Sequence, residues 1–108
     1  YYLAPNILHH ITEPHRLSFA EVIGPSRVQW FVSHWWGHEF CHTVSSILKH
    51  ATHPKVCQGS DWQTISYWIC TFSNNQFDIR EEIGEDETSS SFYLALWSDT
   101  CLGTCLIL

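Results

Sequence analysis

Residues 27–51 read RVQWFVSHWWGHEFCHTVSSILKHA, and this stretch decides the fold. It opens with β-branched and aromatic residues from Arg27 to Ser33, a composition that is typical of a β-strand. Gly37 breaks that pattern, and a helical periodicity follows until Thr52-His53-Pro54. The apolar side chains then fall on one face of a helix: Phe40, Cys41, Val44, Ile47, Leu48 and Ala51. The stretch therefore predicts a strand that leads directly into an amphipathic helix.

Strands and helices alternate in the rest of the chain as well. A short helix over residues 19–23, capped by Ser18, is expected before the first strand. Residues 65–72 are apolar on both faces, which favours a central parallel strand. A helix over residues 92–97 and a third strand from residue 103 complete the series. This order predicts right-handed crossovers and an α/β fold, in which helices cover both faces of a parallel sheet.

The chain divides into two predicted parts. Residues 1–16 show no periodicity and are predicted to form an irregular N-terminal arm, whereas residues 17–108 are predicted to form one α/β domain. Three strands make a thin, incomplete sheet. The chain also starts at Tyr1 without a methionine and stops within the apolar run 104–108. We therefore expect residues 17–108 to be the N-terminal part of a larger domain, truncated from a longer protein.

The charge balance excludes several classes of partner. Eleven Asp and Glu against five Lys and Arg give a formal net charge of −6. Binding to nucleic acid or to an anionic membrane requires a basic face, which this chain cannot build. No apolar run approaches the roughly 20 residues of a membrane-spanning helix. The five cysteines include no CxxC pair, which favours free thiols in a reducing compartment, the cytoplasm or an organelle stroma.

Polar and aromatic side chains follow the first two predicted strands. They are Ser33, His34, Trp35 and Trp36 after the first strand, and Asn74, Asn75 and Gln76 after the second. Because ligands bind at the carboxyl ends of strands in open α/β sheets, the sequence predicts that these residues form one ligand-binding cluster. Trp35 and Trp36 could offer an aromatic platform to a nucleobase, or one of them could anchor the corner in the core. For His34, a packed ring and a ligand contact both stay open.

His38-Glu39-Phe40-Cys41-His42 matches the HExxH pattern of zinc hydrolases. In that pattern His38 and His42 would share a zinc ion on a helix, and Glu39 would act as the base. A metzincin would continue with Gly and His where Ser45 and Leu48 stand, and the candidates for a third ligand are generic: Glu81, Glu82 and Glu85. The motif also falls at a helix start, where its side chains are expected to face solvent. The sequence therefore predicts no metal, and a zinc-dependent hydrolase stays as the alternative.

Three blocks of sequence carry a resemblance to a known family. They are Phe31-Val32-Ser33-His34-Trp35-Trp36-Gly37, then Tyr67-Trp68-Ile69-Cys70 with Asn74-Asn75-Gln76, and Ser91-Phe92 through Ala95-Leu96 to Gly103-Thr104. Over about residues 17–108 the chain resembles a mostly uncharacterised protist and algal family with the SHWWG motif, whose members resemble Toll/interleukin receptor (TIR) domains. The resemblance implies a flavodoxin-like sheet. TIR domains act either as self-associating signalling adaptors or as enzymes that cleave NAD.

The resemblance also sets the functional expectations. It implies a tryptophan-cysteine-x-x-glutamate helix after the third strand, with the catalytic Glu of a TIR NAD hydrolase, but the sequence ends at Leu108. The chain itself is therefore expected to be inactive, to require no cofactor, and to bind NAD at most as a ligand. We expect a TIR-like intracellular module that recognises a protein partner, a second copy of itself, or a nucleotide. The alternatives are the zinc-dependent hydrolase and a structural subunit or fragment in a larger assembly.

Overall fold

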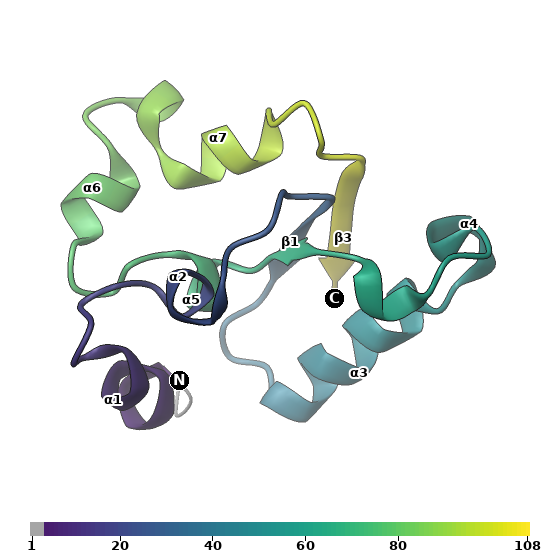
Figure 1. The fold of residues 1–108 in the computed structure, drawn as a ribbon, viewed down its shortest axis with the longest axis horizontal. Helices are drawn as coiled ribbons and strands as arrows, with labels where there is room; N and C mark the ends of the chain where they lie inside the picture. The colour runs from purple at the N-terminus through teal and green to yellow at the C-terminus, as the bar shows by residue number, and fades with distance from the viewer. Residues whose placement is uncertain (1–3) are drawn as a thin grey trace.

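A three-stranded parallel sheet organises the fold (Figure 1). In this computed structural model, which describes residues 4–108 without the side chains at positions 4, 5, 79 and 81, the strands are β1 (Trp30–His34), β2 (Tyr67–Trp68) and β3 (Gly103–Ile107). The central strand is β1, in which Trp30 pairs with Tyr67 of β2 and with Gly103 of β3. The predicted α/β class with a parallel sheet is confirmed. The order β2-β1-β3 is also that of the first three strands of a flavodoxin-like sheet.

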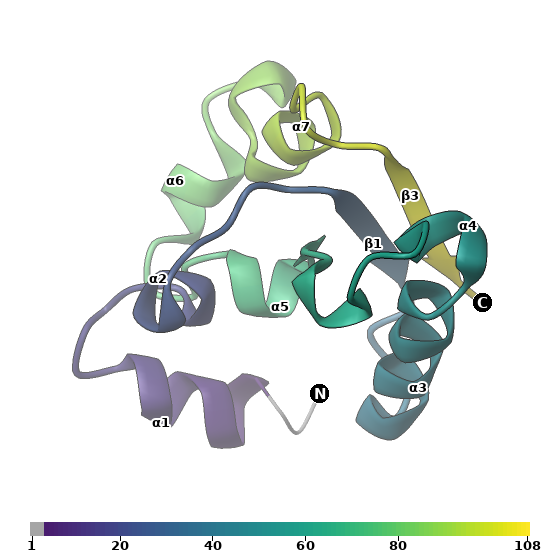
Figure 2. The same ribbon diagram turned by 45° about the vertical axis from the view of Figure 1, so that its right-hand side comes forward.

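Helices lie on both faces of this sheet, as predicted. The helical elements are η1 (Ala4–Leu8), α1 (His9–Thr12), α2 (Phe19–Ile23), α3 (Phe40–Ala51), α4 (Pro54–Cys57), η2 (Trp62–Thr64), α5 (Cys70–Ser73), α6 (Ile79–Ile83), η3 (Glu87–Ser89) and α7 (Ser91–Leu96). Figure 2 shows α3 below the sheet and α7 above it. In the same view α1, α2 and α5 share the lower half of the molecule with α3.

Two apolar layers hold these helices on the sheet. On the α7 face, Phe31 and Trp68 stack with ring centroids 4.9 Å apart and planes 10° apart. On the α3 face the buried side chains are Val32, Cys105 and Ile107, and Ile47 of α3 packs against them. Phe31 and Val32 point to opposite faces because successive residues of a strand alternate. The central strand β1 therefore anchors both layers.

Helix α2 begins and ends where the sequence predicts. The Ser18 backbone N–H donates to Glu21 Oε2 at 2.8 Å, and the Glu21 backbone N–H donates to Ser18 Oγ at 3.2 Å. This reciprocal pair is a capping box, which satisfies two backbone donors that a helix start leaves free. Gly24 ends the helix with φ of 103°, a conformation that side chains with a Cβ rarely adopt.

Helix α3 has the predicted extent, but its apolar face is only partly buried. Thr43 and Ala51 are buried and Ile47 packs against the sheet, whereas four residues of the predicted apolar face stay exposed: Phe40, Cys41, Val44 and Leu48. Cys41, which the periodicity places on the apolar face of the helix, is therefore exposed rather than packed in the core. The apolar face of α3 packs against the sheet at Ile47. Its N-terminal half faces the short helices α2 and α5 instead, and a cleft lies between these three helices.

The predicted strand over residues 65–72 is wrong for most of its length. Only Tyr67 and Trp68 pair with β1, and the chain turns into helix α5 at Cys70. The turn is held by Ile69, whose carbonyl accepts from Ser73 N at 2.8 Å and whose N–H donates to Ser73 Oγ at 3.2 Å. A short apolar run is compatible with a buried strand and with a buried helix turn, so its periodicity does not separate them. Here β2 is a short edge strand rather than a central one.

The predicted irregular arm over residues 1–16 is also wrong in its described part. Residues 4–12 form η1 and α1, and residues 1–3 lie outside the described residues. Pro5 stands in the first turn, where a missing N–H costs nothing, and Pro14 follows the end of the helix. Leu8 and Thr12 are buried, and the Thr12 hydroxyl donates to the Leu8 carbonyl at 2.8 Å. The arm is therefore a packed helical segment.

Candidate functional site

The first predicted group of ligand-binding residues lies at the carboxyl end of β1. Ser33 and His34 belong to the strand and are half-buried, whereas Trp36 and Trp35 are exposed, Trp35 to 68%. The Trp35 ring folds over the turn after β1 and meets the His38 ring edge-on, with centroids 5.3 Å apart. A Cβ at Gly37 would overlap the Trp35 ring, so this fold of the ring depends on the glycine. Two indoles therefore stand at the carboxyl end of the central strand.

The second predicted group has different neighbours. Asn74 is buried and its Oδ1 accepts from Ser91 Oγ at 2.8 Å, at the start of α7. Asn75 donates from Nδ2 to the Arg16 carbonyl at 3.0 Å and from its backbone N to Glu82 Oε1 at 2.7 Å. Gln76 Nε2 donates to the Asn74 carbonyl at 3.4 Å. These hydrogen bonds tie the segment to α6, to α7 and to the turn after α1.

The expectation that both groups stand at strand ends is wrong for the second group. β2 ends at Trp68, and α5 carries the chain through a helical turn before Asn74. Within residues 4–108, no hydrogen bond or ring contact joins Asn74, Asn75 or Gln76 to the group that follows β1. The structure therefore gives the two groups separate surroundings.

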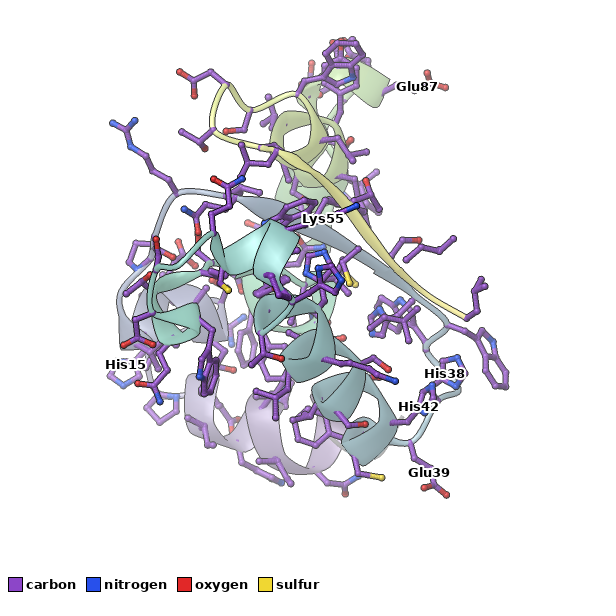
Figure 3. The ribbon with its side chains drawn as sticks, turned by 90° about the vertical axis from the view of Figure 1, so that its right-hand side faces the viewer. His15, His38, Glu39, His42, Lys55 and Glu87 are labelled. Atoms are coloured by element: carbon purple, nitrogen blue, oxygen red, sulfur yellow. The ribbon has the colours of Figure 1, made fainter. Side chains whose placement is uncertain are left out.

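The HExxH motif does not lie on a helix as a whole. Helix α3 begins at Phe40, Glu39 is its extended N-cap residue, and His38 precedes the helix. The rings of His38 and His42 nevertheless lie side by side, with centroids 4.8 Å apart, and Figure 3 shows Glu39 pointing away from both. The Glu39 carboxylate accepts instead from Cys41 Sγ at 3.5 Å.

Neither of the two candidates for a third metal ligand whose side chains are described, Glu82 and Glu85, is grouped with His38 and His42. Glu82 accepts from Asn75 N through Oε1, Glu85 is exposed, and the Glu81 side chain lies outside the described residues. Among the side chains that the structure describes, no three of His, Cys, Asp or Glu are grouped so that they could hold a metal ion. The described part of the motif therefore supplies two neighbouring imidazole rings, those of His38 and His42.

Two histidines have lowered pKa values. Burial lowers the pKa of His34, and the neighbouring His38 charge lowers it further. No hydrogen bond to the His34 ring is found in the described part of the chain, and the side chain is half-buried at the end of β1. Burial also lowers the pKa of His50, with a smaller contribution from His53. Both rings are therefore neutral at neutral pH.

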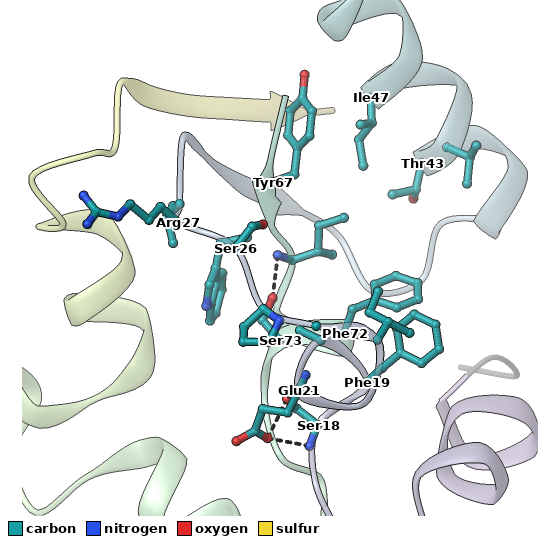
Figure 4. Close-up of a pocket in the computed structure, with 18 of the residues that line it drawn as sticks. Ser18, Phe19, Glu21, Ser26, Arg27, Thr43, Ile47, Tyr67, Phe72 and Ser73 are labelled. Atoms are coloured by element: carbon teal, nitrogen blue, oxygen red, sulfur yellow. Dashed lines mark hydrogen bonds between the residues drawn. The ribbon is translucent and has the colours of Figure 1, made fainter. Parts of the chain in front are cut away.

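The structure forms a cleft between α2, α3 and α5 that the sequence analysis does not predict (Figure 4). Its volume is about 550 Å³, and apolar side chains supply most of its walls, among them Phe19, Phe40, Val44, Ile47 and Phe72. The rings of Phe19 and Phe72 have centroids 5.7 Å apart, and those of Phe40 and Phe72 are 6.1 Å apart. Periodicity placed Phe40, Val44 and Ile47 on one face of a helix, but α5 was predicted as strand, so the opposite wall could not be foreseen.

Large apolar side chains are exposed on α7, on β3 and on the loop between them, and we call this set of residues the α7–β3 surface. Its exposed large apolar residues are Phe92, Tyr93, Leu94, Leu96, Trp97, Leu102, Leu106 and Leu108. Leu106 is 62% exposed and Leu108 is 89% exposed, while their neighbours Cys105 and Ile107 are buried against α3. Residues 91–108 carry one charged side chain, Asp99. Strand β3 is also an edge strand, because it pairs with β1 alone.

Comparison with models of protein families, with curated protein sequences and with solved structures gave no match. Within residues 4–108, no helix combines the length and the apolar character that crossing a bilayer requires.

Proposed function

We propose that this chain is a TIR-like α/β interaction module that binds a second copy of itself through the α7–β3 surface. The observation that carries the proposal is the exposure of Leu106 on β3, which pairs with no strand but β1 among the described residues. An edge strand presents a row of free backbone N–H and C=O groups, to which another strand can pair. Large exposed apolar patches on soluble domains mark interaction sites.

The charge distribution favours a second copy over a charged partner. The chain has a net charge of −6, so most pairs of its faces would repel one another. The stretch from residue 91 to residue 108 has Asp99 as its one charge, so two such surfaces can meet with little repulsion. A two-fold dimer brings the same patch of both subunits together, which suits an apolar, nearly uncharged surface.

The proposal is tested by the oligomeric state of two matched variants. Leu106→Lys puts a charge on the exposed edge, a change that blocks pairing between edge strands. Ile11→Lys puts the same charge on an exposed apolar position of α1. Sedimentation velocity should show a concentration-dependent dimer for the unmodified chain and for Ile11→Lys, and a monomer for Leu106→Lys. A monomer for all three at high concentration, or an equal loss in both variants, contradicts the proposal.

A second candidate function, recognition of a nucleotide such as NAD, has one observation in its favour. Trp35 and Trp36 are exposed at the carboxyl end of the central strand, where α/β sheets bind ligands and where an indole can stack on a nucleobase. Titration with NAD should then shift the amide resonances of residues 33–38, and Trp35→Ala should abolish the shift. Trp97→Ala is the matched control, because Trp97 is an exposed indole on the C-terminal end of α7. Shifts that survive Trp35→Ala, or no shifts at all, exclude this site for NAD.

A further inference from the structure

We propose that the cleft between α2, α3 and α5 binds a small molecule that combines an aromatic body with a basic amine. The cleft of about 550 Å³ lies within the range of roughly 300–1,000 Å³ that is usual for small-molecule sites. Its walls come from α2, α3, α5 and the edge strand β2. The proposal therefore does not depend on the α7–β3 surface.

Three phenylalanines in the lining of the cleft favour a ligand that contains an aromatic ring. Figure 4 shows Phe19 and Phe72 at one end of the cleft, and Phe40 lines it as well. The Phe19 and Phe72 rings meet edge-on at 63°, and the Phe40 and Phe72 rings are tilted by 45°. Aromatic rings favour such edge-to-face and tilted neighbours over a parallel sandwich. A flat ring entering the cleft would therefore find both ring edges and ring faces to pack against.

The Thr43 hydroxyl supplies a polar contact in this apolar wall. Thr43 is 6% exposed and lines the cleft, and its hydroxyl makes no hydrogen bond within the described part of the chain. Because no side-chain oxygen of the described residues is both fully buried and unpartnered, this hydroxyl reaches the surface of the cleft. Thr12 and Thr52, by contrast, each donate to the carbonyl four residues earlier at 2.8 Å. A hydroxyl at the surface of the cleft can exchange its hydrogen bond to water for one to a ligand donor or acceptor. The Thr43 hydroxyl is thus available to a ligand such as an indole N–H.

The charges that line the cleft select a cation. Glu21 and Glu82 carry the carboxylates in the lining, and the cation there is Arg27. Figure 4 shows that the side chains of Glu21 and Arg27 both point away from the rings of Phe19 and Phe72, so Glu21 stands at the exposed rim of the cleft. The capping box fixes Glu21, because Ser18 N and Ser18 Oγ both donate to Oε2, at 2.8 and 2.7 Å. Glu21 Oε1 accepts no hydrogen bond from the described residues. A positioned carboxylate oxygen beside an apolar wall attracts an ammonium group.

The proposal is tested with three probes that share one ring and differ in charge: tryptamine, indole and indole-3-acetate. Amide spectra of the full chain are recorded during each titration. Tryptamine should bind about fivefold more tightly than indole, as expected for one charge pair near the surface, and indole-3-acetate should bind most weakly. The shifted resonances should belong to α2, α5 and the N-terminal half of α3. Equal affinities for the three probes, no binding of any of them, or shifts confined to other elements would overturn the proposal.

Two variants separate the amine contact from the hydroxyl contact. Glu21→Gln keeps the residue type that completes a capping box and removes the charge, so tryptamine and indole should then bind equally. Thr43→Val keeps the side-chain shape and should weaken all three probes alike, about fivefold. Glu87→Gln removes a carboxylate from η3, outside the cleft, and should change nothing. A Glu21→Gln protein that still prefers tryptamine fivefold contradicts the amine contact. The comparison of the three probes on the unmodified chain stands even if a variant fails to fold.

Discussion

The hydroxyl of Tyr67 and Nδ1 of His50 lie 2.8 Å apart, and this hydrogen bond ties α3 to the edge strand β2. Burial, with a smaller effect from Cys105, raises the pKa of Tyr67 to about 12, so the phenol keeps its proton and donates. The lowered pKa of His50 leaves its ring neutral and able to accept. Trp30 meets the same imidazole edge-on, with ring centroids 4.6 Å apart. Three elements, β1, β2 and α3, therefore meet at one histidine.

Tyr67→Phe should lower the free energy of unfolding by about 1 kcal/mol, because it removes the donor and leaves a half-buried imidazole nitrogen without its partner. Urea denaturation monitored by circular dichroism at pH 7.5 measures the loss. Tyr93→Phe is the matched control, since Tyr93 is exposed on α7, and it should leave the midpoint unchanged. Equal midpoints for both variants would show that the hydrogen bond does not stabilise the fold.

Stability should fall when the pH is lowered below about 6.5. The pKa values of His34 and His50 are lower in the folded chain than the ordinary histidine value of 6.5. Above that value both rings are neutral in the folded and the unfolded chain, so their titration contributes nothing. Below it the unfolded chain binds protons first, so the free energy of unfolding decreases until the pH passes the folded pKa values.

Urea denaturation at pH 7.5, 6.5 and 5.5 measures this dependence. The double variant His34→Gln/His50→Gln should flatten the decrease, whereas His15→Gln, at an exposed histidine, should not. An unchanged slope in the double variant would mean that other groups cause the decrease.

Ser18→Ala should destabilise the chain by about 1 kcal/mol, because it removes the side-chain oxygen that accepts from Glu21 N at the start of α2. Ser45→Ala serves as the control, since the Ser45 hydroxyl is exposed and donates to the backbone His42 carbonyl within the helix. Its effect should stay within about 0.5 kcal/mol. Chemical denaturation of the two variants side by side measures the difference between their free energies of unfolding. A Ser18→Ala chain as stable as the Ser45→Ala chain would refute a stabilising capping box.

The cysteines should react with a thiol reagent in two groups. Cys41 is exposed, whereas Cys70 and Cys105 are buried, and burial raises the pKa of Cys70 to about 11 and also raises that of Cys105. Since the thiolate is the reactive form, Cys41 should react first at pH 8, and the two buried thiols should react only when the chain unfolds. Mass spectrometry of the modified peptides identifies each site. The fast step should disappear in Cys41→Ser, and early labelling of Cys70 in the native chain would contradict the described core.

Sequence reasoning succeeded where a local pattern determines the structure. The capping residue Ser18 and the periodic run of α3 each leave a signal within a few positions, and both elements appear where expected. The alternation of strands and helices also sufficed for the parallel α/β class. Sequence reasoning failed at residues 69–73, where an apolar run forms a helical turn held by Ser73. An apolar run is compatible with a buried strand and with a buried helix, so burial alone does not separate them.

The candidate sites were harder to predict, since they depend on packing between elements. The exposed indoles after β1 follow from the strand boundary, and the sequence places them correctly at its carboxyl end. The position of Asn74 does not follow from a strand boundary, because α5 moves this residue to the start of α7, where the Ser91 hydroxyl donates to it. The cleft needs α2, α3 and α5 together, and the α7–β3 surface needs the knowledge that β3 is an edge strand.

The most direct test of association through the α7–β3 surface is hydrogen exchange of the β3 amides at low and high protein concentration. Pairing with a second copy should slow exchange of the outward-facing amides within residues 103–107 about tenfold at high concentration, with little change in α1 or α4. The Leu106→Lys chain should show the low-concentration rates throughout. Exchange in β3 that is independent of concentration, in samples that sedimentation shows to be dimeric, would place the interface elsewhere and contradict the account.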